Sequence, residues 1–144
     1  MIQTLRKNAL SIIFAPLILL TACTSPSDKL TKELKTVSSW SATVRMVGEA
    51  LMGGEVPDAY AKRTLDTAAQ NLEDESKTLS NSSDLPGDER ARAQEQVGRI
   101  RQLVGQTKAA VEGKDRSALA QLIAQLMIEE QAVKSSIKDV SGQR

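Results

Sequence analysis

Cys23 is the only cysteine of the 144-residue chain, and it follows an apolar segment that covers residues 9–20. Arg6 and Lys7 precede this segment, and the small residue Ala22 lies directly before the cysteine. A basic start, a short apolar run and a small residue at its boundary are typical of an export signal that is removed. The run is also shorter than the ~20 residues that a membrane-spanning helix needs. We therefore expect the segment to be cleaved, with Ala22 as a permitted boundary and the thiol close to the start of the mature chain.

Leu20, Thr21, Ala22 and Cys23 together resemble the lipobox of bacterial lipoproteins, in which the cysteine is lipid-modified and becomes the first mature residue. The resemblance implies a diacylglyceryl group on the Cys23 sulfur and an acyl chain on its amine. One acyl chain binds membranes only marginally, at about 0.8 kcal/mol per buried methylene, whereas three chains would anchor the protein permanently. In Gram-negative lipoproteins an aspartate after the cysteine typically retains the protein in the inner membrane, so Thr24 implies transport to the outer membrane. Cleavage without lipid attachment stays open as the alternative.

The remaining side chains offer little for catalysis. The chain has no histidine, so the commonest general base and metal ligand is missing. A lipid-modified Cys23 could not act as a nucleophile. No serine lies in a nucleophile-elbow sequence, and there is no glycine-rich phosphate loop. We expect a protein without enzymatic activity, cofactor or metal, and a Ser–Lys hydrolase is the weaker alternative.

Two acidic features could bind a cation or form a buried ion pair. Residues 73–75 read Glu-Asp-Glu, and consecutive residues of a helix point about 100° apart, so they converge poorly on one ion. Glu130 interrupts an otherwise apolar stripe. Its carboxylate either reaches water at the edge of that stripe, or it is buried against an arginine such as Arg99 or Arg101.

Trp40 and four small residues are candidates for contacts between helices or with a partner. Trp40 either covers the edge of the core or is exposed, in which case it would be the first candidate for a partner contact, because tryptophan contributes disproportionately to interfaces. Ser41 and Gly48 are seven residues apart, as are Gly98 and Gly105. Such spacing lets helices approach closely; a groove for a partner helix is the alternative.

Apolar or small residues recur every three or four positions in four segments, which is typical of helices that bury one face. The stripes are Leu30, Leu34, Val37, Ser41, Val44, Gly48 and Leu51; Ala61, Leu65, Ala68, Leu72, Ser76 and Leu79; Ala93, Val97, Ile100, Val104, Thr107 and Val111; and Leu119, Ile123, Leu126, Glu130, Val133, Ile137 and Val140, the last widened by Leu122 and Met127.

Helix-breaking residues separate these segments. Ser25 is the expected cap of the first helix and Asp115 that of the fourth; glycine lies at each boundary between the helices, and proline at the first two. Each helix is close to 25 residues, or roughly 37 Å long. Equal lengths and short loops favour antiparallel neighbours. The sequence therefore predicts an all-α, antiparallel up-down-up-down four-helix bundle that follows a cleaved signal peptide.

The expected domain organisation follows from these boundaries. Residues 1–22 form the signal peptide, 23–28 a short lipid-anchored tether, 29–141 the bundle and 142–144 a C-terminal tail. Loss of the signal lowers the net charge from +1 to −1, which gives no electrostatic reason to expect a nucleic-acid partner.

An anchor without catalytic residues favours a function through protein contacts. We expect a non-catalytic interaction, scaffolding or escort module at the membrane surface, which faces the periplasm from the outer membrane. Its partners would be membrane lipid, bound through Cys23, and an envelope protein. The expected architecture is similar to that of secretin pilotins, some of which are lipoproteins with small helical bundles. The alternative is a periplasmic carrier that holds a small apolar ligand in a cavity between the helices.

Overall fold

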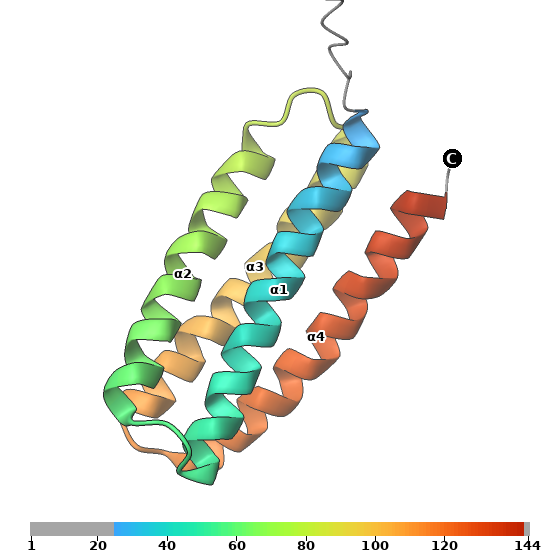
Figure 1. The fold of residues 1–144 in the computed structure, drawn as a ribbon. Coiled ribbons are helices and arrows are strands. Elements are labelled where there is room, and N and C mark those ends of the chain that lie inside the picture. The colour runs from blue at the N-terminus through green and yellow to red at the C-terminus, as the bar shows by residue number, and fades with distance from the viewer. Residues whose placement is uncertain (1–24, 143–144) are drawn as a thin grey trace, which may run out of the picture.

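The structure, a computed structural model, describes residues 25–142, so the expected signal peptide, Cys23 and Thr24 lie outside the described residues. The chain forms four helices: α1 (Pro26–Gly53), α2 (Asp58–Ser80), α3 (Gly87–Glu112) and α4 (Arg116–Gly142). Each helix runs antiparallel to the one before it (Figure 1). The all-α up-down-up-down four-helix bundle predicted from the sequence is confirmed.

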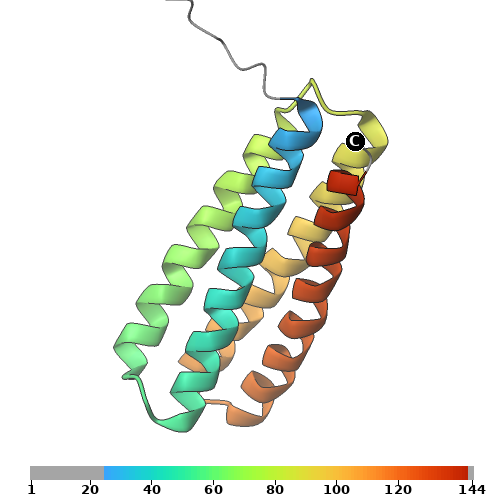
Figure 2. The same ribbon diagram turned by 45° about the vertical axis from the view of Figure 1, so that its right-hand side comes forward.

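The helices follow one another around the bundle in chain order. Helix α1 packs against α2 and α4, and α3 packs against the same two helices, while α1 and α3 make fewer contacts across the diagonal. The start of α1, the α2–α3 loop and the end of α4 lie together, at what we call the near end (Figures 1 and 2). The α1–α2 loop and the α3–α4 turn lie at the opposite end, the far end.

Helix α1 begins where its capping residues predict. The Ser25 side chain accepts a hydrogen bond from the backbone N–H of Asp28 at 3.2 Å, and Pro26 occupies the first helical turn. At the other end Gly54 adopts a left-handed conformation with φ of 72° and closes the helix. Helix α1 therefore begins three residues before the expected start of the bundle at residue 29, and α4 ends one residue after its expected end at residue 141.

The α2–α3 loop is held against the start of α1. Leu85, in the middle of the loop, is buried in the core. Asp84 forms an ion pair with Lys29 of α1 at 3.2 Å, and Arg90 donates a hydrogen bond to the backbone carbonyl of Ser82 at 3.0 Å. These contacts fix the loop although its sequence is polar.

The predicted stripes form the core, except that Leu51, Ser76, Ile137 and Val140 are only partly buried and Met127 is exposed. Those buried in each helix are, on α1, Leu30, Leu34, Val37, Ser41, Val44 and Gly48; on α2, Ala61, Leu65, Ala68, Leu72 and Leu79; on α3, Ala93, Val97, Ile100, Val104, Thr107 and Val111; and on α4, Leu119, Leu122, Ile123, Leu126, Glu130 and Val133. The prediction for Met127 was wrong, because its side chain is 52% exposed. It follows the buried Leu126 by about 100° of helical rotation, on the side away from the core.

The small residues divide into two groups. At Gly48 a Cβ atom would lie 2.9 Å from Ile123 Cδ1, so this glycine lets α1 and α4 approach closely, as predicted. At Gly98 and Gly105 an added Cβ would meet nothing within 4 Å. The prediction that these two glycines mediate close packing within the bundle was therefore wrong, since both lie on the exposed face of α3.

Substituting the exposed glycines is expected to stabilise the bundle. Gly98→Ala and Gly105→Ala should each raise the free energy of unfolding by about 0.5–1 kcal/mol, because alanine has the higher helix propensity and nothing obstructs its methyl group. Gly48→Ala is the matched control. It should cost about 1 kcal/mol despite the same gain in propensity, because Ile123 must shift. Urea denaturation measures all three, and equal effects at the three positions would contradict the packing described above.

Candidate partner-binding cleft

Glu130 is buried between α4 and α1, with only 5% of its surface exposed. Its Oε2 atom accepts a hydrogen bond from Arg45 Nε at 3.1 Å, and its Oε1 atom accepts one from Lys134 Nζ at 2.6 Å. Arg45 also donates to Glu49 at 2.9 Å. Of the two alternatives that the sequence left open for Glu130, the structure shows burial against an arginine and not exposure to water at the edge of the stripe.

The arginine that pairs with Glu130 is not one of the two suggested by the sequence. Arg99 of α3 pairs with Glu129, the neighbour of Glu130, and Arg101 pairs with Glu73 of α2. The reason is rotation along α4: consecutive residues differ by about 100°, so Glu129 faces α3 whereas Glu130 faces α1. The ion pairs of Glu130 with Arg45 and Lys134 thus join α1 to α4 and have a structural role.

Opposing effects act on the ionisation of Glu130. Burial alone would raise its pKa, but the hydrogen bonds and positive charges of Lys134 and Arg45 outweigh burial and lower the pKa below its ordinary value of 4.5. The carboxylate is therefore ionised at neutral pH, and its two cations satisfy both of its oxygens.

Trp40 lies half-buried against the edge of the core. It is seven residues from Glu33 on the same side of α1, the side that faces α2. Its accessible part borders a shallow depression on the outer surface of α1 that also includes Lys32 and Ser39. The structure thus places Trp40 at the core edge, and its contact with a partner stays a prediction.

The acidic run at residues 73–75 is spread over three directions. Glu73 pairs with Arg101 of α3, Asp74 is exposed beside Lys77, and Glu75 faces α1. Within residues 25–142 no three side chains of the metal-ligating types come together.

Glu75 of α2 lies opposite a carboxyl group of α1, and its pKa is strongly raised. Its Oε2 atom is buried, and no hydrogen-bond donor among residues 25–142 reaches it. The group opposite is the carboxyl of Glu33, so a hydrogen bond between them requires that one of the two carries a proton. Burial, this hydrogen bond and the negative charge of Glu33 raise the pKa of Glu75 to about 7.

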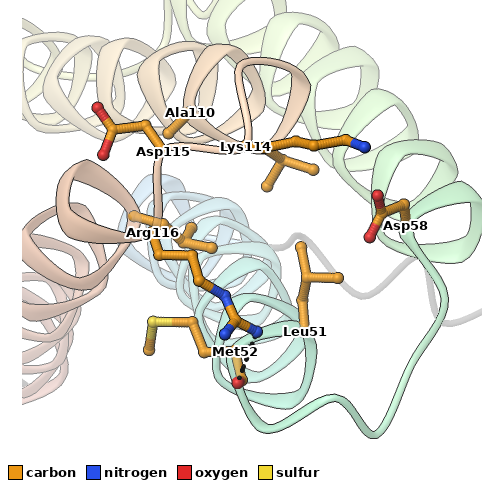
Figure 3. A pocket seen from close by; sticks show the side chains of 9 residues that line it. Leu51, Met52, Asp58, Ala110, Lys114, Asp115 and Arg116 are labelled. Atoms are coloured by element: carbon orange, nitrogen blue, oxygen red, sulfur yellow. Dashed lines mark hydrogen bonds between the residues drawn. The ribbon is translucent and has the colours of Figure 1, made fainter.

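The sequence did not indicate the cleft at the far end of the bundle, to which all four helices contribute (Figure 3). Its volume is about 190 Å³. The lining residues are Leu51 and Met52 of α1, Asp58 of α2, Ala110 and Val111 of α3, Lys114 and Asp115 of the α3–α4 turn, and Arg116 and Leu119 of α4. Apolar side chains thus form the floor, and charged side chains surround it.

Lys114 adopts an unfavourable backbone conformation in this cleft. Its φ angle is 54°, in the left-handed region that favours glycine, and it is the one residue other than glycine with positive φ in the described chain. Gly113, directly before it, has an ordinary φ of −76°. A non-glycine residue in the left-handed region costs roughly 1 kcal/mol. The turn therefore places a lysine where the glycine beside it would be more stable.

The charges of the cleft are only partly used within the bundle. Asp115 accepts a hydrogen bond from the Ala118 N–H at 2.9 Å, as its predicted role as the α4 cap requires, and its carboxylate points away from the cleft (Figure 3). Arg116 donates one hydrogen bond, to the Met52 carbonyl at 3.2 Å. Lys114 forms no ion pair within residues 25–142, and its side chain extends toward Asp58 (Figure 3). Two cations and one carboxylate are thus left to meet a ligand.

The position of the cleft could not be found from residue types alone. It depends on the left-handed turn at Lys114 and on how the ends of all four helices meet, and the sequence signal for this was limited to the short turn after Gly113. The lipobox residues Leu20 to Cys23 lie outside the described residues, so their role stays a prediction. None of the four described helices is both long and apolar enough to cross a bilayer.

No known family model matches the chain, and comparisons with curated proteins and with solved structures give no match either.

Proposed function

We propose that the chain is a lipid-anchored protein of the cell envelope that acts as a non-catalytic interaction module, a scaffold or escort for an envelope protein. The observation that carries the proposal is the position of Pro26 at the near end of the bundle (Figure 1). Only Thr24 and Ser25 separate this first helical residue from Cys23. Each can span at most ~3.5 Å, so a lipid on Cys23 would hold the near end against the bilayer.

The far end would then face away from the membrane. Helix α1 has 28 residues and is therefore about 42 Å long, and the cleft lies at its distal end. By the resemblance described above, Thr24 favours the outer membrane, from which the cleft would face the periplasm. In this orientation the near end of the bundle faces lipid, and the far end is accessible to a protein partner.

The chemistry of the cleft supports binding. The chain has no histidine, and the charged groups around the cleft are Asp58, Lys114, Asp115 and Arg116 on an apolar floor. The alternative, a carrier of apolar ligands, needs a cavity between the helices. The side chains that would line such a cavity, such as Leu65, Ile100 and Leu126, are fully buried in one packed cluster.

The proposal can be tested by site-specific photo-crosslinking in intact cells. A photoreactive residue at Glu55, exposed in the α1–α2 loop of the far end, should capture a discrete protein adduct. The same residue at Ser83, exposed in the α2–α3 loop of the near end, should give no such adduct, because that loop would face lipid. In parallel, mass analysis of the mature protein should find Cys23 at its start with three acyl chains attached.

Cys23→Ser is the control for the anchor. It should abolish the lipid mass, recovery in the outer-membrane fraction and the Glu55 adduct together, while the bundle remains folded because Cys23 precedes the helices. Adducts that are equal from both ends, or an unmodified Cys23 thiol on the wild-type protein, would contradict the proposed function.

A further inference from the structure

The far-end cleft has a size that limits what it can hold. Its volume is about 190 Å³, below the ~300–1,000 Å³ of sites that enclose drug-sized molecules or cofactors. Its floor consists of Leu51, Val111 and Leu119, which belong to three different helices. A single apolar side chain from a partner therefore fits this space better than a whole small-molecule ligand.

The charges around the floor favour a carboxylate beside that apolar side chain. Lys114 has no ion-pair partner within the described chain, and Arg116 keeps donors in addition to the one bound to the Met52 carbonyl. The acid between them, Asp115, is engaged by the Ala118 N–H and points away. The Lys114 side chain extends toward Asp58 but forms no ion pair with it (Figure 3), so both neighbouring cations keep donors on the side of the cleft, where a carboxylate could pair with them.

Asp58 completes the set of groups that a peptide end requires. It lies across the cleft from the α3–α4 turn, in the first turn of α2, and it can accept a hydrogen bond from a backbone N–H (Figure 3). A free carboxylate, an apolar side chain and an N–H group occur together, within one residue, at the carboxyl terminus of a polypeptide.

We propose that the far-end cleft binds the carboxyl terminus of a partner polypeptide, with the terminal carboxylate between Lys114 and Arg116 and the last, apolar side chain on the floor. This inference deepens the proposed function and rests on it, since it specifies how the partner is recognised. The left-handed backbone at Lys114 closes the end of α3, where the Asp115 N–H donates to the Ala110 carbonyl at 2.9 Å, and the Lys114 side chain extends toward Asp58 (Figure 3).

The test uses the purified chain from Thr24 onward, which carries no lipid and includes all four helices, and N-acetyl-L-leucine, which has all three groups of a peptide end. In ¹⁵N-resolved NMR titrations, the amides of the α3–α4 turn and of the end of α1 should shift with a dissociation constant on the order of 1–10 mM, as expected for so small a ligand. N-acetyl-leucinamide, which lacks the carboxylate, and N-acetylglycine, which lacks the side chain, should each bind at least about fivefold more weakly.

Two variants at Lys114 separate binding from folding. Lys114→Gly should raise Tm by about 2–5 °C, because it relieves the backbone, and still weaken the binding of acetyl-leucine at least about fivefold. Lys114→Gln should weaken binding equally without the rise in Tm, and Lys77→Gln, an exposed lysine outside the cleft, should change neither.

Three results would overturn the inference: no shifts at about 20 mM ligand, equal binding of the amide, or equal binding of inorganic phosphate, which would indicate an anion site without side-chain recognition. Because the titration requires neither a lipid on Cys23 nor a membrane, its failure leaves the anchored module intact. Conversely, loss of the Glu55 adduct in cells would affect the proposed function independently of this titration.

Discussion

Replacing Arg45 with methionine is expected to lower the free energy of unfolding by about 2–3 kcal/mol, as measured by urea denaturation at pH 7. The substitution removes one of the two cations that pair with Glu130, whose side chain is only 7% exposed. Removing a hydrogen-bonding cation from a buried carboxylate costs far more free energy of unfolding than breaking a surface ion pair. Lys134 remains at 2.6 Å, which keeps the loss below that of an entirely unpaired charge.

Arg99→Met is the matched control for this substitution. Arg99 also joins two helices, through Glu129 at 3.2 Å, but its side chain is 45% exposed. We expect a loss below about 1 kcal/mol, because exposed ion pairs contribute little. The double variant Arg45→Met/Glu130→Leu should recover most of the stability lost in Arg45→Met, since no buried charge is left unpaired. Equal losses for Arg45→Met and Arg99→Met would show that the burial of Glu130 is not important.

The low pKa of Glu130 also sets its pH window. A carboxylate whose pKa is lower in the folded state stabilises the fold above its unfolded pKa, and that contribution disappears as the pH falls through the folded value. The contribution of Glu130 is therefore complete at pH 7 and lost only below about pH 4.5.

The second large effect is a fall in stability as the pH rises from about 4.5 to about 7, caused by Glu75. An acid whose pKa is raised in the folded state binds its proton more tightly there than in the unfolded chain. Its stabilising protonation is complete below the unfolded pKa of 4.5 and is lost as the pH passes the folded value of about 7. Because the site is partly accessible to solvent, we expect a change of about 1 kcal/mol, well below the full value of such a shift.

Glu75→Gln should abolish this pH dependence. It should raise the free energy of unfolding by about 1 kcal/mol at pH 8 and leave it unchanged at pH 5, where Glu75 of the folded protein is already neutral. Asp74→Asn, next to it on α2 with a side chain that is 78% exposed, is the control and should change both values only slightly, because the charge of Asp74 is the smallest contribution to the raised pKa of Glu75. The prediction is sharp because the chain has no histidine, the side chain that ordinarily titrates between pH 5 and 8. A wild-type stability that stays constant between pH 5 and 8 would disprove it.

The fold followed from the sequence because helix periodicity and chain breaks are local properties. The stripe from Leu30 to Leu51 needs only its own spacing to define a buried face, and the cap at Asp115 needs only three neighbouring residues. Four such helices of similar length have few ways to bury their faces, and the antiparallel bundle is the simplest.

The errors concern relations between helices, which spacing within one helix does not determine. The partner of Glu130 depends on the order of the helices around the bundle and on the relative height of α1 and α4. Neither can be derived from a stripe, so Arg45 was missed although it directly follows the buried Val44. The same holds for Gly98 and Gly105: seven-residue spacing places two glycines on one face of α3 but does not say whether that face is covered.

The cleft was out of reach for a related reason. Its residues come from all four helices and are adjacent only because the α1–α2 loop and the α3–α4 turn end at the same height. The one local feature, the left-handed backbone at Lys114, depends on a turn in which the preceding glycine takes an ordinary conformation. No rule of turn composition predicts that order, because such rules place the glycine at the left-handed position.

The near end brings the first residue of α1 and the last turn of α4 together on helices that contact each other. A short linker between residues 142 and 25 could therefore close the chain, and a new opening in the α1–α2 loop would yield a circular permutant with the same core. If a lipid were attached at that opening, the permutant would be held in the reverse orientation, with the far-end cleft against the bilayer. By the proposed function, such a molecule would fold but would not capture the partner, which would separate the effect of orientation from that of folding.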